Sequence, residues 1–308
     1  MSTVLVTGGL GFIGRRLVDQ LRSMDFSVIV FDNLSAGSVE ELPRGCCFAR
    51  GDVRNLEELK ASLRDMELVA HLAARVSVAE SVEDPHLYHE VNAFGTLNIL
   101  KASLEANVKR VVYTSTTAVY GDPLELPTTE NCPLRPLSPY GASKAAGELY
   151  CQAFYKSYGL ETVILRVFNV YGPGMRSGPY AGVIYSFMEK LSTRQPPIIY
   201  GDGNQTRDFI YVDDVVSAII KALEAKGVAG EAFNIGTGKE TSINELLQLL
   251  YEVTGITLTP IYEEPRPGDI RRSVANITKA KTQLSWTPEV PLEEGLTRTW
   301  HWFTARTL

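Results

Sequence analysis

The sequence predicts an α/β protein in which a doubly wound parallel sheet is combined with a smaller mixed α/β domain. Apolar runs typical of buried strands alternate with helical stretches through the first half of the chain. A glycine-rich turn joins the first of these runs to the first helical stretch. After residue 168 the pattern changes to shorter segments separated by turns. The 308 residues are enough to bury one large core or two modest ones.

The strands and helices of the first domain are expected to alternate along the chain. Strands are predicted at 3–6, 27–31, 67–72, 110–114 and 161–166, and helices at 12–24, 55–64, 86–106 and 138–158. Because parallel strands need a crossover connection, this order favours right-handed βαβ units. The first domain is assigned to residues 1–168. The second takes most of 169–308, with a segment near 212–236 returning to the first and helices expected near 180–194, 212–226, 242–254 and 291–304.

Charge and residue content argue against several classes of protein. The 30 Lys and Arg residues and 36 Asp and Glu residues give a net charge of −6, so neither nucleic acid nor an anionic membrane surface is expected as a partner. The first residues lack a basic region followed by an apolar signal core, and no apolar run approaches about 18 residues, so a cytoplasmic location is expected. The cysteines form no C-x-x-C pair and the histidines no H-E-x-x-H motif, so no metal site is expected.

The glycine-rich turn carries the first functional signal. Gly9, Gly11 and Gly14 fit the spacing Gly-x-Gly-x-x-Gly between an apolar run and a helical stretch. Such glycines permit a tight turn and let backbone N–H groups approach a pyrophosphate, which the positive end of the helix also attracts. A dinucleotide is therefore expected to bind here. Its contacts in the turn are predicted to be Gly8, Gly11, Phe12, Ile13 and Gly14.

The end of the next predicted strand indicates which dinucleotide binds. Asp32 lies near the spacing of roughly 20 residues at which a carboxylate meets the adenosine ribose. A carboxylate there accepts hydrogen bonds from both ribose hydroxyls and repels a 2′-phosphate. Asn33, Leu34 and Ser35 follow, with no arginine to bind that phosphate. The sequence therefore favours NAD over NADP, with Asp32 and Asn33 among its contacts.

A second functional signal is a tyrosine and a lysine four residues apart. Tyr140 and Lys144 follow Ser138 and Pro139, which are good residues for a helix start, and positions i and i+4 share a helix face. A phenol has an unperturbed pKa of about 10. A nearby ammonium group together with a positive nicotinamide ring would lower the pKa of Tyr140 towards neutrality. Tyr140 is thus the predicted general base for an alcohol.

The run of hydroxyl side chains at 114–117 closes the strand that precedes this helix. A hydroxyl at the carboxyl end of a parallel strand faces the crevice in which ligands bind. Thr116 is therefore predicted to hydrogen-bond the substrate hydroxyl and to guide its proton to Tyr140. The alternative interpretation is that these threonines reflect only the β-propensity of a strand end.

Together these residues resemble the extended short-chain dehydrogenase/reductase family, and within it the nucleotide-sugar 4-epimerases. The resemblance runs over essentially the whole chain. The segments that carry it are Thr7 to Gly14, Asp52-Val53, His71 to Ala74, Asn92 with Gly95-Thr96, Ser115-Thr116, Tyr140 with Lys144, Leu165 to Gly172, Gly201 to Gly203, Thr206 to Phe209 and Arg266 to Asp269.

The resemblance implies further contacts with NAD and with a UDP-sugar. For NAD it adds, beside Tyr140 and Lys144, the residues Asp52, Val53, Leu72, Ala73, Ala74, Asn92, Thr114 and Phe168. For the UDP-sugar it implies that Asn169, Arg207 and Arg266 hold the uridine diphosphate, because two arginines can neutralise a diphosphate by forked hydrogen bonds. Ile198 and Tyr200 are expected beside the uracil, Asp269 at a ribose hydroxyl, and Val183 near the substrate.

The family also commonly forms homodimers, through a four-helix bundle made by the helices that correspond to 86–106 and 138–158. The resemblance therefore predicts a homodimer. The apolar residues of both helices fit this arrangement, although a helix packed on its own sheet is apolar too.

Two departures from the glucose-specific members concern the sugar. Those members carry a lysine near the nicotinamide, where this chain has Val76, and the stretch that includes Ser77 resembles members that use N-acetylated sugars. Ser273 occupies the position at which a bulky tyrosine restricts glucose-only enzymes. A serine there leaves room for a 2-acetamido group, so Ser77 and Ser273 are expected to contact the substrate.

Other reactions on the same fold are less consistent with the residues present. Dehydratases and UDP-glucuronate decarboxylases carry acidic residues after the catalytic Thr or Ser, where this chain has Thr117 and Ala118. A non-catalytic nucleotide-sensing module typically lacks the tyrosine or the lysine. The expected activity is NAD-dependent 4-epimerisation through a transient 4-keto sugar, acting on UDP-glucose/UDP-galactose and on UDP-N-acetylglucosamine/UDP-N-acetylgalactosamine. UDP-glucuronate is kept as an alternative substrate.

Overall fold

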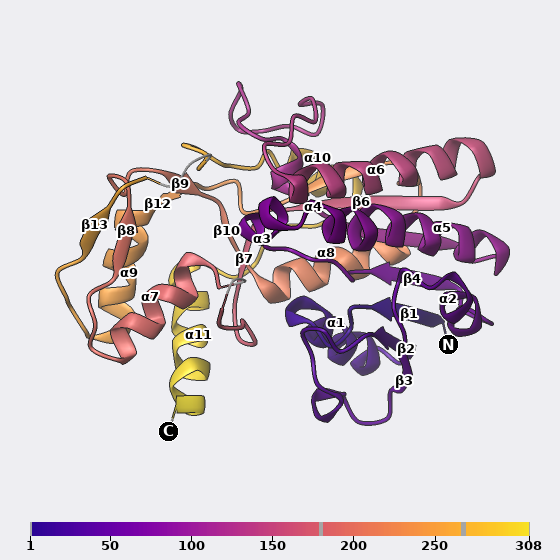
Figure 1. The fold of residues 1–308 in the computed structure, drawn as a ribbon, viewed down its shortest axis with the longest axis horizontal. Helices are drawn as coiled ribbons and strands as arrows, with labels where there is room; N and C mark the ends of the chain where they lie inside the picture. The colour runs from indigo at the N-terminus through magenta and orange to yellow at the C-terminus, as the bar shows by residue number, and fades with distance from the viewer. Residues whose placement is uncertain (1, 179–180, 266–268, 308) are drawn as a thin grey trace.

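The computed structural model describes residues 2–178, 181–265 and 269–307 (Figure 1). Its largest feature is a 7-stranded sheet with the strand order β11-β6-β5-β4-β1-β2-β3. Every pair in this sheet is parallel, which confirms the predicted fold class. The strands are β1 (Thr3–Thr7), β2 (Ser27–Asp32), β3 (Cys47–Arg50), β4 (Leu68–His71), β5 (Arg110–Thr116), β6 (Glu161–Val167) and β11 (Ala232–Ile235).

The strand order changes direction beside β1. The sheet extends through β2 and β3 on one side of β1, and through β4, β5 and β6 on the other. In doubly wound sheets, ligands bind in the crevice at the carboxyl ends of the strands at such a point. Thr7 and His71, the last residues of β1 and β4, are paired in register there. The topology therefore places a ligand site at this edge.

Helices cover both faces of the sheet, and successive side chains of a strand pack alternately into the cores on the two faces. Val4 and Val6 of β1 pack in the core with α1 and α8, whereas Leu5 packs in the core on the opposite face. Burial of each such side chain contributes about 1.5–3 kcal/mol to stability. The covering helices are α1 (Phe12–Ser23) and α8 (Val212–Glu224) on one face, and α2 (Leu56–Ser62), α5 (Gly95–Glu105) and α6 (Pro139–Tyr158) on the other.

Local sequence signals fix both ends of α6. The Ser138 hydroxyl accepts a hydrogen bond from the Gly141 N–H at 3.1 Å, and Pro139 is the first helical residue. Gly159 ends the helix in the left-handed conformation, with φ of 74°. Because the start is fixed in this way, Tyr140 lies in the first turn of the helix.

The first half of the chain differs from the predicted elements in several places. The sequence does not predict β3, a short edge strand that is at least partly exposed along its length and carries no clear apolar pattern. The predicted helix 86–106 consists of three pieces: α4 (Pro85–Tyr88), the π-helical turn η2 (His89–Phe94) and α5. A further short helix, α3 (Val78–Glu83), precedes them. Asp84 separates α3 from α4, and its side chain caps α4.

A smaller lobe follows β6, at the left of Figure 1. It has a core of its own, in which Phe187, Leu246 and Leu296 are buried. The chain returns to the large sheet within this half, since α8 packs against α1 and β11 pairs with β6. The remaining elements are β7 (Asn169–Tyr171), α7 (Val183–Ser192), β8 (Ile198–Tyr200), β9 (Thr206–Arg207), β10 (Phe209–Tyr211), β12 (Thr241–Ser242), α9 (Ile243–Thr254), β13 (Ile261–Glu263), α10 (Thr278–Gln283) and α11 (Leu292–Thr307).

Candidate active site

The glycine-rich turn between β1 and α1 is packed too closely to accept side chains without rearrangement at three of its glycines. A Cβ atom on Gly8 would lie 2.8 Å from the Ala73 backbone, and φ of Gly8 is +66°. A Cβ on Gly14 would lie 2.2 Å from the Gly8 carbonyl oxygen. A Cβ on Gly9 would lie 2.8 Å from Cγ1 of the buried Val30 and 3.2 Å from the Val6 carbonyl oxygen, so the Gly9 of the sequence motif is closely packed as well.

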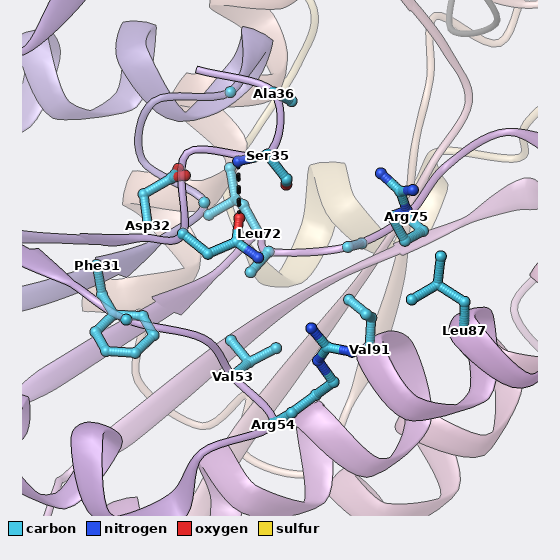
Figure 2. A pocket seen from close by; sticks show the side chains of 16 residues that line it. Phe31, Asp32, Ser35, Ala36, Val53, Arg54, Leu72, Arg75, Leu87 and Val91 are labelled. Atoms are coloured by element: carbon cyan, nitrogen blue, oxygen red, sulfur yellow. Dashed lines mark hydrogen bonds between the residues drawn. The ribbon is translucent and has the colours of Figure 1, made fainter. Parts of the chain in front are cut away.

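A cavity of about 240 Å³ lies between this turn and the ends of the neighbouring strands (Figure 2). Asp32 and Arg75 lie at opposite ends of it, with Val53 and Val91 between them. Eight of the predicted NAD contacts line the cavity: Gly8, Gly11, Asp32, Asn33, Val53, Leu72, Ala73 and Ala74. The sequence reasoning missed the other lining residues, which are Phe31, Ser35, Ala36, Gly51, Arg54, Arg75, Leu87 and Val91.

The Asp32 carboxylate holds the glycine-rich turn in place. Its Oδ2 accepts a hydrogen bond from the Leu10 N–H at 3.0 Å, and its Oδ1 accepts one from the Leu34 N–H at 2.8 Å. The side chain is buried, with 8% of the residue exposed. Asp32 thus has a structural role in the cavity wall in addition to the predicted recognition of a ribose.

Asp52 lies beyond Asp32 and is held by polar neighbours. Arg54 donates to both of its carboxylate oxygens, at 3.0 and 2.9 Å, and the Asn33 amide donates to Oδ2 at 3.0 Å. The hydrogen bonds from Arg54 lower the pKa of Asp52 to about 2. Asp52 is therefore ionised at neutral pH, and it orients Asn33 and Arg54, which both line the cavity.

The predicted catalytic residues meet where β5 ends beside α6. Tyr140 is 9% exposed and Lys144, one turn later, is 3% exposed. The Lys144 Nζ donates to the Thr114 carbonyl oxygen at 2.6 Å and lies 4.3 Å from the centre of the Tyr113 ring. Burial lowers the pKa of Lys144 to about 7. The lysine is thus anchored to the strand that carries Thr116.

The pKa of Tyr140 departs from the sequence-based expectation. Burial raises it above its ordinary value, and a hydrogen bond with Thr116 only partly opposes this shift. The expected lowering combines the Lys144 ammonium group with a positive ring that a bound cofactor would bring. The Thr116 hydroxyl also accepts a hydrogen bond from the Ala118 N–H at 3.2 Å, so its side chain is held in position at the strand end.

Two further predicted NAD contacts, Asn92 and Phe168, lie near this edge without lining the cavity. The Asn92 amide is bonded to the backbone of Arg75 and to Ser143. Phe168 is 4% exposed and packs in a small core cluster with Val119. Thr114 at the end of β5 has a buried hydroxyl that finds no partner among the described residues.

The predicted substrate contacts come mainly from the smaller lobe. Arg207 forms an ion pair with Asp269 and donates to the Ile270 carbonyl oxygen at 2.7 Å, which fixes β9 against the segment that contains Ser273. Ser273 is 5% exposed. The Asn169 amide oxygen is buried and has no hydrogen-bond partner in the described part of the chain. Arg266 lies outside the described residues.

The other predicted substrate contacts are spread over separate elements. Ile198 and Tyr200 are the two ends of β8, and Val183 begins α7. The Ser77 hydroxyl accepts a hydrogen bond from the Glu80 N–H at 3.2 Å and thereby caps α3. None of these residues is among those that line the cavity beside the glycine-rich turn.

Among the described residues, no group of three or more His, Cys, Asp and Glu side chains could hold a metal ion. No helix in the described part of the chain is long and apolar enough to cross a membrane.

Comparisons with known proteins identify the family. Residues 4–236 match the NAD dependent epimerase/dehydratase family. The chain is 44% identical to a putative UDP-glucose 4-epimerase of Methanocaldococcus jannaschii, covering 97% of each protein. Solved structures similar to this chain include UDP-glucose 4-epimerase of Thermotoga maritima with UDP-glucose. Its TM-score is 0.96 at 42% identity, and the match covers 99% of this chain and 100% of that one. Another is UDP-N-acetylglucosamine 4-epimerase of Methanobrevibacter ruminantium with UDP-N-acetylmuramic acid (TM-score 0.95, 38% identity, 99% of each chain). The chain therefore belongs to the NAD-dependent epimerase/dehydratase family.

Proposed function

We propose that this protein is a 4-epimerase of UDP-hexoses. The observation that carries the proposal is the placement of Tyr140, Lys144 and Thr116 at the strand edge that also holds the glycine-rich cavity. A buried phenol beside a dinucleotide site can exchange a proton with a sugar hydroxyl. This arrangement is suited to oxidation and reduction of the carbon that bears the hydroxyl. Relatives named as UDP-glucose and UDP-N-acetylglucosamine 4-epimerases support this reaction.

Features of the chain itself support NAD as the ligand of the cavity. The close packing at Gly8 and Gly14 brings backbone N–H groups to the start of α1, where a pyrophosphate binds. Asp32 lies at one end of the cavity for the adenosine ribose, and the unpartnered Thr114 hydroxyl offers a hydrogen bond near Lys144. When bound, NAD supplies a hydride acceptor that later returns the hydride, so no net oxidation results.

Within this reaction the protein moves one proton and holds the sugar. Tyr140 takes the proton from the sugar O4 and later returns it, while Thr116 hydrogen-bonds the same hydroxyl. The ammonium group of Lys144 stabilises the phenolate form of Tyr140. Inversion requires that the sugar present both faces of C4 to the same groups, so the sugar pocket must bind it loosely while the uridine diphosphate is held firmly.

We assign the uridine diphosphate to the smaller lobe, residues 169–308 apart from the segment near 212–236 that lies on the large sheet. Arg207 and Arg266 are proposed to neutralise the diphosphate. The buried Asn169 oxygen, which lacks a partner among the described residues, fits a donor group of the ligand. In this proposal Asp269, now paired with Arg207, also accepts from a ribose hydroxyl, with Ile198 and Tyr200 beside the uracil and Val183 near the substrate.

The test of the proposed function is incubation with UDP-glucose, UDP-N-acetylglucosamine and UDP-glucuronate separately, without added NAD, followed by analysis of the sugars. We expect conversion of the first two into their 4-epimers. Conversion of UDP-glucuronate alone would support the alternative substrate. A purified protein that contains NAD and converts none of the three would contradict the proposal.

Ser273 is expected to admit the N-acetylated sugar. We predict that wild type converts UDP-N-acetylglucosamine at a rate within about tenfold of UDP-glucose, a gap of roughly 1.4 kcal/mol in transition-state free energy. Ser273→Tyr should suppress the acetamido substrate by steric exclusion and spare UDP-glucose. Ser273→Ala is the control for loss of the hydroxyl alone. Equal losses for both sugars in Ser273→Tyr would rule out Ser273 as the selective residue.

We also propose a homodimer through the helix pair α5 and α6. Several large apolar side chains on or beside these helices are exposed, namely Phe94 (45%), Leu149 (58%), Tyr150 (37%) and Tyr158 (60%). A second copy of the chain would cover them, because a two-fold interface pairs the same surface of both subunits. Sedimentation velocity should give a dimer for wild type and for the control Leu124→Glu, which alters an exposed side chain of the 120–135 loop, and a monomer for Leu149→Glu. If Leu149→Glu is a dimer like wild type and Leu124→Glu, the proposed interface is wrong.

A further inference from the structure

A continuous chain of hydrogen bonds runs beneath the cavity, between the glycine-rich turn and the catalytic helix. Its members come from β1, β4, η2, α5 and α6, and each is at most 6% exposed. They are the side chains of Thr7, His71, Thr96 and Ser143, together with Asn92, which takes part through both its main-chain carbonyl and its side-chain amide. The mechanism proposed above does not use His71, the second member of this chain.

The donors and acceptors of this chain have only one consistent order. The Thr96 hydroxyl donates its single proton to the main-chain carbonyl oxygen of Asn92 at 2.5 Å. Towards the His71 Nε2 atom, 3.1 Å away, Thr96 can therefore only accept, so Nε2 carries a proton. Burial, followed by the charge of Lys144, lowers the pKa of His71 to about 3, which keeps the ring neutral. Its Nδ1 atom then has a free lone pair.

The other end of the ring completes this order. The Thr7 hydroxyl, 2.7 Å from Nδ1, donates to it and accepts the Ala73 N–H at 3.2 Å. Every polar atom of the His71 ring is thus satisfied in the Nε2–H form. In the opposite tautomer the proton is on Nδ1. It would then point at the Thr7 hydroxyl proton, or the Thr7 hydroxyl would have to accept from Nδ1 instead of donating to it. The position of Ala73, whose backbone packs on Gly8, depends on this bond.

The far end of the chain reaches the catalytic helix. The Asn92 amide accepts from the Arg75 N–H at 2.8 Å and donates to the Arg75 carbonyl oxygen at 2.9 Å. Its remaining N–H donates to the Ser143 hydroxyl at 3.0 Å, which donates to the Tyr140 carbonyl oxygen at 2.8 Å. The π-helical turn η2 places Asn92 between these two partners. The cavity wall at 73–75 and the first turn of α6 are therefore linked through these hydrogen bonds.

We propose that His71, as the neutral Nε2–H tautomer, is a positioning residue. It fixes the position of the cavity wall at 73–75 relative to the helix that carries Tyr140. The inference deepens the proposed function and rests on it for the catalytic consequence. The hydride acceptor must reach C4 of the sugar and the proton acceptor must reach O4, each within a fraction of an ångström. A misplacement of about 1 Å can cost on the order of 10² in rate. A neutral ring with one donor and one acceptor transmits this geometry without placing another charge beside Lys144.

The first test measures the tautomer without any need for turnover. In protein labelled with ¹⁵N at its 4 histidines, the ring signals of His71 are assigned by their loss in His71→Asn. We expect one protonated and one unprotonated ring nitrogen at neutral pH, with the proton on Nε2. An imidazolium ring, or a proton on Nδ1, would overturn the inference even if the enzyme is a 4-epimerase.

The second test breaks the chain with shape-conserving variants. Thr96→Val and Thr7→Val each remove one hydroxyl, and Thr96→Ser and Thr7→Ser restore it. We expect kcat to fall about tenfold or more in the valine variants, with the KM for the UDP-sugar unchanged and with recovery in the serine variants. Thr162→Val is the matched control, because Thr162 is fully buried and donates to the Cys151 carbonyl oxygen at 2.9 Å outside this chain.

The outcomes separate this inference from the proposed function. A loss of kcat no larger in Thr96→Val and Thr7→Val than in Thr162→Val would overturn the positioning role. If wild type converts none of the UDP-sugars, the proposed function fails, and the tautomer together with NAD affinity then decides the inference. In that case Thr7→Val, which leaves the Ala73 N–H without its acceptor, should weaken NAD binding several-fold relative to Thr162→Val, and equal affinities would overturn it.

Discussion

Replacing Tyr140 with phenylalanine should lower kcat for 4-epimerisation by on the order of 10² or more while NAD and the UDP-sugar still bind. The ring of Tyr140 packs edge-on against Tyr88 at 6.3 Å between centroids, and phenylalanine keeps this contact. The variant loses only the phenolic oxygen, which exchanges the proton with O4 in the proposed reaction. The measurements are kcat, KM and the NAD content of the purified protein.

The control for this variant is Tyr251→Phe. Tyr251 lies in α9 of the smaller lobe, and its hydroxyl donates to the Leu258 carbonyl oxygen. The Tyr251→Phe variant loses the same atom far from the strand edge, so its kcat should stay near that of wild type. Near-normal epimerisation by Tyr140→Phe, or an equal loss in both variants, would remove Tyr140 from the role of proton acceptor.

The parts of the fold that the sequence predicts are those encoded locally. β1, the glycine-rich turn and α1 follow one another within the first 23 residues, and the start of α6 is set by Ser138 and Pro139. The edge strand β3 is different. It is held by pairing with β2, and its 4 residues have no alternation of buried and exposed positions that would reveal it. Tertiary pairing, rather than local propensity, forms it.

The same distinction applies to the candidate site. The sequence identifies the backbone cradle and the Tyr140–Lys144 pair, because glycine spacing and the i, i+4 rule are local. Arg75 and Val91 line the cavity only because α4, η2 and the wall after β4 pack together, a geometry that no short motif specifies. Pairs such as Arg207 with Asp269, 62 residues apart, also depend on how the smaller lobe folds.

A buried ion pair behind Lys144 illustrates what sequence analysis cannot find, and it carries the largest expected effect on stability. Glu148 is fully buried one turn after Lys144, and Arg166 of β6 is 3% exposed. The Arg166 Nη2 atom donates to Glu148 Oε2 at 2.7 Å, and Nε donates to both oxygens at 3.1 and 3.0 Å. The Ser115 hydroxyl donates to Glu148 Oε1 at 2.5 Å. The pair thus joins β5, β6 and α6 close to the predicted catalytic residues.

Glu148→Met should therefore lower the free energy of unfolding by about 3–5 kcal/mol, because it leaves the Arg166 guanidinium buried without its counter-charge. The double variant Glu148→Met/Arg166→Met should cost much less than the sum of the two single variants, since it removes both charges and keeps apolar side chains of similar length. Urea-induced unfolding of the four proteins measures this coupling.

The control is an ion pair on the surface. Arg298 and Glu294 pair across one turn of α11, with side chains 47% and 51% exposed. Water screens such a pair, so Glu294→Met should change stability far less than Glu148→Met does. The difference between the two sites isolates burial as the cause, because both pairs consist of a glutamate and an arginine on regular elements. If Glu148→Met costs no more than Glu294→Met, the pair below Lys144 is not what holds β6 to the catalytic helix.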